Sequence, residues 1–254
     1  MPTEFLYGRR PIFESLRAGR RRHQRLILSE TLKKADLLAE IQELARARDI
    51  PVKTVGRSFF DEHIGDVNHQ SVALETSPYP YVDIADILAR VKGSSEPAFI
   101  LLLDHLQDPQ NLGSILRTAE AAGVHGVIIP ERRAVEVTPS AVRASAGASE
   151  HMAVARVVNL VNAMNGLKED GLWLAGLDAG PDSVLYTAAD LKGAVGLVIG
   201  AEGEGLGRLV GETCDYRIRL PMQGQVASLN AGVASGIAMY EVRRLRDAAA
   251  SAKG

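Results

Sequence analysis

The chain has 254 residues, of which 46% are hydrophobic and 24% charged, and its formal net charge is −2. This length suits two modest domains, and the composition is ordinary for a globular protein. A nearly neutral chain does not bind nucleic acid through its total charge, and no apolar run reaches the roughly 18 residues that a membrane helix needs.

The sequence contains few of the residues that disulfide or metal chemistry requires. Its single cysteine, Cys214, cannot form an internal disulfide. Its six histidines lack a ligand spacing such as His-x-x-x-His, so we expect no bound metal. The N-terminus also lacks the basic stretch followed by an apolar stretch that is typical of a secretory signal. Together these features predict a cytoplasmic protein.

The first 25 residues carry a local excess of positive charge. Seven arginines stand there against two glutamates, a surplus of five positive charges. Arginine suits bidentate contacts with phosphate groups. A solvated basic helix end is the alternative interpretation. The candidates for phosphate contacts are Arg9, Arg10, Arg20, Arg21 and Arg22.

Residues 1–77 have the pattern of a small α/β module. Apolar residues recur at helical spacing within 11–17 and 33–48. Short apolar runs bounded by turn residues predict strands between and after these helices. The predicted strands lie at 25–29, 51–55 and 72–76.

We expect a linker at residues 78–97, where a Pro-rich break and a Gly- and Ser-containing turn flank a brief amphipathic helix. Residues 98–254 change to continuous apolar runs, separated by stretches long enough for helices. Strands without polar alternation are buried on both faces, which predicts a mostly parallel sheet covered by helices. The main runs are 99–103, 126–129, 173–176 and 195–199.

Three segments of the second domain join an apolar run to a helical or glycine-rich run. They are residues 111–117, 200–206 and 220–230. In an open α/β sheet, ligands bind at the carboxyl ends of the strands. We therefore expect the three segments to form one composite site.

Polar residues within these segments are the candidates for chemistry. Asn111 is expected to cap a helix, and Arg117 lies roughly 9 Å further along its axis, from where the guanidinium can reach back. A structural ion pair is the alternative role for Arg117. Glu202 stands in a glycine-rich turn at a strand end. Ser228 is expected to cap the last helix, with Asn230 at its second position.

The three segments read Asn-x-Gly-x-x-x-Arg, Gly-x-Glu-Gly-x-Gly-Leu and Pro-Met-x-Gly-x-x-x-Ser-Leu-Asn. In this order they resemble the motifs of the SpoU (TrmH) RNA ribose 2′-O-methyltransferases of the SPOUT superfamily, over residues 98 to about 246. Residues 7–16 and 136–148 are similar to the bacterial subgroup that modifies a guanosine of 23S ribosomal RNA.

The resemblance implies an α/β fold in which a parallel-sheet domain at 98–254 ends in a deep trefoil knot. It implies a small ribosomal-protein-like α/β domain at 1–77 that binds RNA, for which the arginines named above are the candidate contacts. It also implies a homodimer, with RNA as the partner and no membrane attachment.

The resemblance further implies S-adenosylmethionine as the cofactor, held in the knot largely by backbone atoms. The implied contacts are Gly200, Leu220, Met222 and Leu229, with Leu177 as a weaker candidate. The implied catalytic residues are Asn111, Arg117, Glu202, Ser228 and Asn230.

A guanidinium is not deprotonated in proteins at ordinary pH, so Arg117 is a poor candidate for a general base. We expect Arg117 to stabilise the developing 2′-alkoxide and to position a substrate phosphate that relays the proton. The other polar residues of the three segments would orient the ribose and Arg117.

Three other functions fit parts of the sequence. A transfer-RNA or antibiotic-resistance ribosomal-RNA ribose methyltransferase would use the same chemistry. A non-catalytic RNA-binding scaffold on this fold would not need the polar residues of the three segments together. A nicotinamide dehydrogenase is suggested only by glycines, and those at 203, 205, 207 and 211 do not have the Gly-x-Gly-x-x-Gly spacing.

Overall fold

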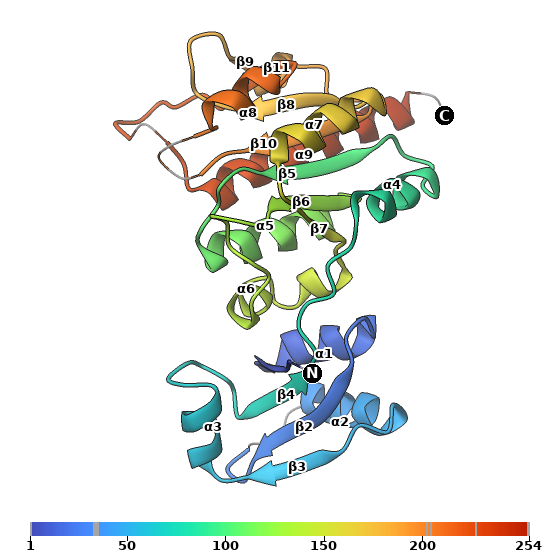
Figure 1. Cartoon of the computed structure of the whole chain (residues 1–254), viewed down its shortest axis with the longest axis vertical. Coiled ribbons are helices and arrows are strands. Elements are labelled where there is room, and N and C mark those ends of the chain that lie inside the picture. Colours follow the sequence, from blue (N-terminus) through green and yellow to red (C-terminus); the bar gives the residue numbers. More distant parts are fainter. Residues whose placement is uncertain (1, 33–35, 202, 204, 227, 253–254) are drawn as a thin grey trace. The chain divides into compact units, whose positions relative to one another are not determined.

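The computed structural model describes residues 2–32, 36–201, 203, 205–226 and 228–252. The chain forms two compact units, which Figure 1 shows in the colours of the sequence. The first unit comprises Met1–Pro80 together with Glu136–His151, and the second comprises Tyr81–Val135 together with Met152–Gly254. No helix among the described residues has the length and apolar character needed to cross a membrane.

The first unit contains a mixed sheet, and the described residues give it four strands in the order β1-β4-β2-β3. The central strand β4 is antiparallel to both neighbours, while β3 is parallel to β2. The sequence predicted β2, β3 and β4 but missed β1. The strands are β1 (Glu4–Tyr7), β2 (His23–Ser29), β3 (Val52–Val55) and β4 (Val72–Thr76).

Short helices pack on this sheet because each carries an apolar side. Ile12 and Leu16 of the first helix and Ile41 of the second are fully buried, as is Phe60 of the third. These helices are α1 (Arg9–Ala18), α2 (Asp36–Ala47) and α3 (Arg57–His63). Helix α6 (Pro139–Ala144) and the 3-10 turn η1 (Ala148–His151) belong to the same unit.

A buried ion pair joins η1 to the N-terminal residues of this unit. Arg21 Nε lies 2.8 Å from Glu150 Oε2, and both side chains are almost completely buried. Tyr79 Oη donates to the carbonyl of Ser149 at 3.1 Å. Ionised groups are rarely buried unless they are paired, so these contacts explain how a segment more than 100 residues away in sequence is held in this unit.

The second unit contains a sheet in which all neighbouring strands are parallel. Its described residues form seven strands in the order β7-β6-β5-β10-β8-β11-β9. This confirms the prediction of a parallel sheet from the uninterrupted apolar runs. The strands are β5 (Phe99–Leu103), β6 (Gly126–Pro130), β7 (Val154–Val157), β8 (Trp173–Leu177), β9 (Val184–Leu185), β10 (Val195–Ile199) and β11 (Tyr216–Arg219).

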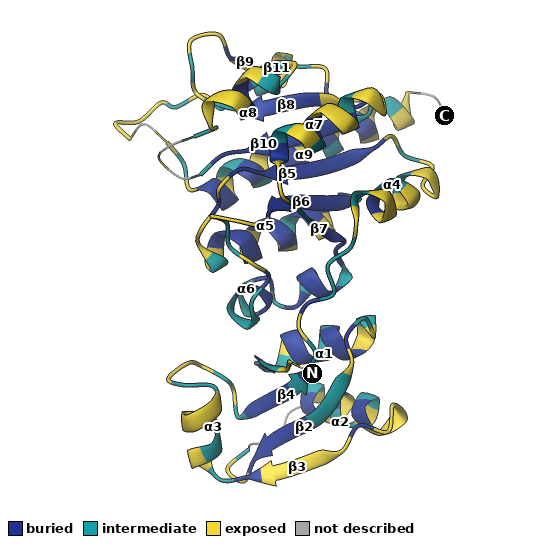
Figure 2. Cartoon of the chain, in the orientation of Figure 1, coloured by how far each residue is buried: buried dark blue, intermediate teal, exposed yellow. Residues whose placement is uncertain are grey.

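Helices cover both faces of this sheet, and Figure 2 shows its central strands as buried. On one face, α4, α7 and α8 contribute Ile87, Met164 and Val210 to a cluster with Ile100 and Val198 of the sheet. On the other face lie α5 and α9, which also pack against each other. The helices are α4 (Ile84–Lys92), α5 (Pro109–Ala121), α7 (Leu160–Glu169), α8 (Arg208–Thr213) and α9 (Ala231–Ser251), and η2 (Tyr186–Ala188) is a single 3-10 turn.

Candidate cofactor cavity and its flanking residues

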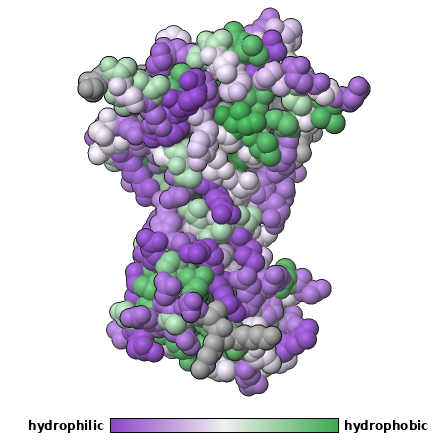
Figure 3. Space-filling model, turned by 180° about the vertical axis from the view of Figure 1, so that it is seen from behind, coloured by the Kyte–Doolittle hydropathy of each residue, from purple (hydrophilic) through white to green (hydrophobic). Residues whose placement is uncertain are grey.

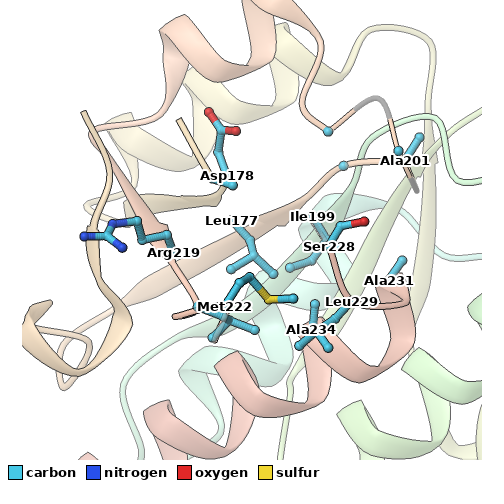
Figure 4. Close-up of a pocket in the computed structure, with 15 residues that line it drawn as sticks. Leu177, Asp178, Ile199, Ala201, Arg219, Met222, Ser228, Leu229, Ala231 and Ala234 are labelled. Atoms are coloured by element: carbon cyan, nitrogen blue, oxygen red, sulfur yellow. The ribbon is translucent and has the colours of Figure 1, made fainter. Parts of the chain in front are cut away.

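A cavity of about 320 Å³ lies at the carboxyl ends of β8, β10 and β11 (Figure 4). Its volume falls within the range of small-molecule sites. The position agrees with the general rule for ligands of parallel sheets. The residues that line it are Leu177, Asp178, Ala179, Ile199, Gly200, Ala201, Gly203, Gly205, Arg219, Leu220, Met222, Ser228, Leu229, Ala231 and Ala234.

The glycine-rich wall of the cavity depends on the absence of a side chain at Gly200. A Cβ atom placed there would lie 2.1 Å from the carbonyl oxygen of Gly205. The chain turns back on itself after β10, and Gly205 N donates to the carbonyl of Ala201 at 3.0 Å. Gly203 and Gly205 adopt positive φ angles of 81° and 70°, which glycine tolerates without strain.

The loop after β11 forms the opposite wall. Leu220, Met222 and Leu229 line the cavity, and in Figure 4 the side chains of Met222 and Leu229 lie close to that of Leu177. Among the described residues, the backbone of 221–226 and 228–229 makes no hydrogen bond to another segment. This wall therefore offers both an apolar surface and unused backbone donors and acceptors.

Charged groups stand at the margin of the cavity rather than in its apolar part. Asp178, which follows β8, accepts a hydrogen bond from Arg217 Nη1 at 3.3 Å. Arg219 Nε donates to the carbonyl of Ser183 at 3.1 Å. An apolar pocket with a few polar groups at its margin suits a ligand that has a flat apolar part and polar substituents.

The amides of Asn111 and Asn230 join two of the three sequence segments directly. Asn230 Nδ2 donates to Asn111 Oδ1 at 2.8 Å. Asn230 Oδ1 also accepts from the backbone N–H groups of Gly232 and Val233, so Asn230 is the N-cap of α9. Leu229 and Ala231, its two neighbours in sequence, line the cavity.

These contacts correct two predictions about helix ends. Ser228 does not cap the last helix, because α9 begins at Ala231 and Asn230 caps it. Asn111 is not a cap either, because α5 begins at Pro109 and the carboxylate of Asp108 accepts from the backbone N–H groups of Gln110 and Asn111. Asn111 lies in the first turn of α5 and is buried.

Small residues let α5 and α9 approach closely beside this amide pair. A Cβ atom on Gly232 would lie 3.1 Å from Ser114 Oγ. One turn later, a Cβ atom on Gly236 would lie 3.6 Å from the methyl group of Thr118. The glycines of α9 thus bring α5 and α9 into close contact along two helical turns.

The remaining predicted catalytic residues have different surroundings. Ser228 lines the cavity and is exposed. Arg117 is exposed on α5, and its side chain makes no hydrogen bond or ion pair with any residue in the described part of the chain. The described residues therefore do not include an ion-pair partner for Arg117, which was the alternative role considered for it. Glu202 lies outside the described residues.

Sequence reasoning missed two carboxylates of the cavity region, Asp178 at its margin and Asp104 behind its glycine-rich turn. Asp104 follows β5, is 1% exposed, and accepts a hydrogen bond from Gly207 N at 2.8 Å. Its other carboxylate oxygen contacts His105 Nδ1. Asp104 thus holds the end of the glycine-rich turn. An acidic residue directly after an uninterrupted apolar strand is the sequence signal that could have revealed it.

The arginines of the first unit that were predicted to bind phosphate differ in how far they are buried. Arg21 is corrected to a structural residue, since its buried guanidinium pairs with Glu150 and Glu4. Arg20 is half-buried and donates to Tyr79, to the carbonyl of Glu150 and to the carbonyl of Pro80. Arg9 is half-buried, whereas Arg10 and Arg22 are exposed.

Two further features of the described residues concern possible metal ligands and the cysteine thiol. Among these residues, no three His, Cys, Asp or Glu side chains lie close enough to share a metal ion. Burial raises the pKa of the Cys214 thiol to about 12, which leaves it protonated at neutral pH.

Comparison with known proteins places the cavity in a family context. The sequence profile of the SpoU rRNA methylase family matches residues 98–240, and that of the RNA 2′-O ribose methyltransferase substrate-binding domain matches residues 5–82. The chain belongs to the SpoU/TrmH family of RNA 2′-O-ribose methyltransferases. The substrate-binding profile covers the N-terminal part of the first unit, whereas Glu136–His151 of that unit and the residues that line the cavity lie within the methylase profile.

Relatives of similar length support this assignment. A Bacillus subtilis protein, YacO, assigned to the TrmH family of tRNA/rRNA methyltransferases, is 41% identical over 96% of both chains. A Staphylococcus saprophyticus protein assigned to the same family is 43% identical over 95% of this chain and 96% of its own.

Solved structures of the family have the same fold. AviRb, a SpoU methyltransferase of Streptomyces viridochromogenes in complex with AdoMet, superposes with a TM-score of 0.80 at 26% identity, covering 97% of this chain and 91% of its own. An AdoMet-bound rRNA methyltransferase from Sinorhizobium meliloti superposes with a TM-score of 0.77 at 25% identity, covering 95% and 87%.

Proposed function

We propose that this family member binds S-adenosylmethionine in the cavity at the carboxyl ends of β8, β10 and β11 and methylates the ribose 2′-hydroxyl of a guanosine in 23S ribosomal RNA. The observation that carries the proposal is the convergence of Leu177, Gly200, Leu220, Met222 and Leu229 on one cavity. These are the residues that family resemblance selects for the cofactor.

The composition of the cavity suits this cofactor. Leu177, Met222 and Leu229 offer an apolar surface for a purine ring, and unused backbone groups of 221–226 can bond its polar edge. Asp178 supplies a carboxylate at the margin for hydroxyl or amino groups. When bound, S-adenosylmethionine supplies an electrophilic methyl group. Residues of the protein then have to position and activate the 2′-oxygen of the ribose.

Arg117 is the cation that we assign to that activation. A guanidinium stays protonated, so it stabilises negative charge on the 2′-oxygen, while a substrate phosphate that it positions takes up the hydroxyl proton and the donor leaves as S-adenosylhomocysteine. Its lack of a partner among the described residues leaves it able to bind substrate. Asn111, Asn230 and Ser228, together with Glu202, would orient the ribose, and Asn111 and Asn230 fix each other through their hydrogen bond.

The assembly implied by the family is part of the proposal. Val233, Ile237 and Tyr240 are exposed at intervals of one helical turn on α9, and Figure 3 shows apolar side chains gathered on one face of the second unit. A homodimer formed through α9 would cover them. The close backbone approach at Gly200 is compatible with a C-terminal trefoil knot. A cytoplasmic location would give the enzyme access to ribosomal RNA.

Transfer RNA is the second candidate substrate, because YacO and the Staphylococcus protein carry a combined tRNA/rRNA designation. The two substrates can be separated with unmodified transcripts of 23S rRNA and of tRNAs, incubated with the protein and methyl-labelled S-adenosylmethionine. We expect label on 23S rRNA, mapped to the 2′-oxygen of one guanosine. Label on tRNA alone would replace the rRNA assignment.

Arg117→Ala tests the catalytic part of the proposal. We expect turnover to fall at least a hundredfold while calorimetry shows unchanged binding of S-adenosylmethionine. Arg90→Ala removes another exposed arginine of the second unit, on α4, and should leave turnover intact. Turnover of Arg117→Ala near that of the wild type would overturn the assigned role.

A further inference from the structure

The loop that follows β6 presents two arginines that the proposed chemistry does not use. Arg132 and Arg133 follow the last residue of β6, Pro130, and both are exposed. Because the sheet is parallel, this loop and the cofactor cavity belong to the same, carboxyl edge. Strand β6 is separated from β10 only by β5, which puts the two strands about 10 Å apart.

Backbone hydrogen bonds hold both ends of this loop. Glu131 N donates to the carbonyl of Val157 in β7 at 2.9 Å, and Val135 N donates to the carbonyl of Leu106 at 2.7 Å. Arg156 Nη2 donates to the carbonyl of Glu131 at 3.3 Å. The first end of the loop is therefore anchored to β7, and the second end is anchored to Leu106, which follows β5 in the chain.

The conformation of Arg133 is unusual for its residue type. Its φ angle is 55°, in the left-handed region that side chains rarely adopt. The anchors at Glu131 and Val135 maintain it. A residue held in this region often has a functional reason, and here it is one of two adjacent exposed arginines in an anchored loop.

The two guanidinium groups are also free within the described structure. Neither Arg132 nor Arg133 forms an ion pair or a side-chain hydrogen bond with any residue there, although Glu131 and Glu136 flank them in sequence. Other arginines of this unit do pair, for example Arg243 with Glu96 at 2.9 Å. Unpaired, exposed guanidinium groups on an anchored turn suit bidentate contacts with phosphate groups.

We propose that Arg132 and Arg133 bind backbone phosphates of the RNA next to the target nucleotide, so that the strand lies across the carboxyl ends of β5 and β6 on its way to the cavity. The inference rests on the proposed function. The two arginines are positioning residues for RNA, and neither acts on the methyl donor.

The test compares two variants that each remove two positive charges from the second unit. Arg132→Ala/Arg133→Ala, the track variant, removes the two arginines proposed to guide the RNA. Arg90→Ala/Lys92→Ala, the control pair, alters exposed residues of α4. Ile87 of α4 lies against Gly126, the first residue of β6, so the control pair is near the opposite edge of the sheet. The RNA used is the unmodified transcript that the wild type methylates, 23S rRNA or tRNA.

For the track variant we expect the KM for RNA to rise about tenfold, kcat to stay within about twofold, and S-adenosylmethionine to bind as in the wild type. The slope of log Kd for RNA against log salt should become shallower by about 1.4, since each lost contact to single-stranded RNA contributes roughly 0.7. Arg132→Lys/Arg133→Lys keeps the charge and should recover most of this salt slope. The control pair should leave all these quantities unchanged.

An unchanged KM and salt slope in the track variant would overturn the inference while methylation by the wild type upheld the proposed function. Equal losses in the control pair would also overturn it, because the effect would then be one of net charge. If the wild type methylates neither transcript, the proposed function fails and the inference fails with it.

Discussion

The side-chain amide of Asn230 donates a hydrogen bond of 2.8 Å to Asn111, 119 residues away in sequence, and its oxygen Oδ1 caps α9. One amide thus fixes the start of the helix that lines the cavity and the first turn of the helix that carries Arg117. The two helices cannot shift along each other without breaking this contact. We interpret the pair as the link between the cofactor cavity and the substrate side of the site.

Replacing Asn230 should separate its two roles. Asn230→Ala removes the cap and the contact with Asn111, and we expect it to lower the free energy of unfolding by about 1–3 kcal/mol, measured by urea denaturation. Asn230→Ser restores a capping oxygen but not the contact, so it should recover about 1 kcal/mol and remain defective in turnover. Wild-type turnover in Asn230→Ser would show that the link to Asn111 is dispensable.

The wall of the cavity depends on a missing side chain. Gly200→Ala would place a methyl group 2.1 Å from the carbonyl oxygen of Gly205, which neither backbone segment can accommodate without moving. We expect calorimetry to show at least a thirtyfold loss of affinity for S-adenosylmethionine. Gly166→Ala on α7 is the matched control, because a Cβ atom there meets open space and the residue does not line the cavity, and it should bind as the wild type does.

The first unit should depend strongly on Arg21. Removing one partner of a buried ion pair leaves an uncompensated charge, so Arg21→Met should cost about 3–5 kcal/mol of unfolding free energy. Arg10→Met alters an exposed arginine that pairs with Glu14 at 3.7 Å and should cost less than about 1 kcal/mol. Comparable effects in denaturation experiments would contradict the structural role assigned to Arg21.

Acid should destabilise the second unit through His125. Burial lowers the pKa of His125, and its Nδ1 accepts a hydrogen bond from Phe99 N at 3.1 Å, which requires an unprotonated nitrogen. The unfolded chain then binds more protons than the folded one, so stability should fall as the pH drops below about 6.5 through the lowered pKa.

His125→Asn offers an acceptor without a titration in this range. Its thermal midpoint should decline less than that of the wild type between about pH 7 and pH 5. Parallel declines of the two proteins would rule out His125 as a source of the acid sensitivity.

Local patterns in the sequence were sufficient for much of the fold. The apolar runs 99–103 and 195–199 coincide with β5 and β10, and the absence of polar alternation correctly indicated a parallel sheet buried on both faces. The short strand β1 was missed because four residues at an edge carry little periodic signal. Segment 136–151 belongs to the first unit through contacts that no local pattern encodes.

The sequence by itself identified the three segments that carry polar residues, and the rule for parallel strands correctly indicated that 200–206 and 220–230 meet at one edge of the sheet, where both contribute residues to the cavity. Only the tertiary structure decided what individual polar side chains do. It made Asn230 a cap and a partner of Asn111, buried Arg21 against Glu150, and set Asp104 beneath Gly207. These roles depend on partners more than 100 residues away, and the surroundings of a side chain are fixed only when the whole chain has packed.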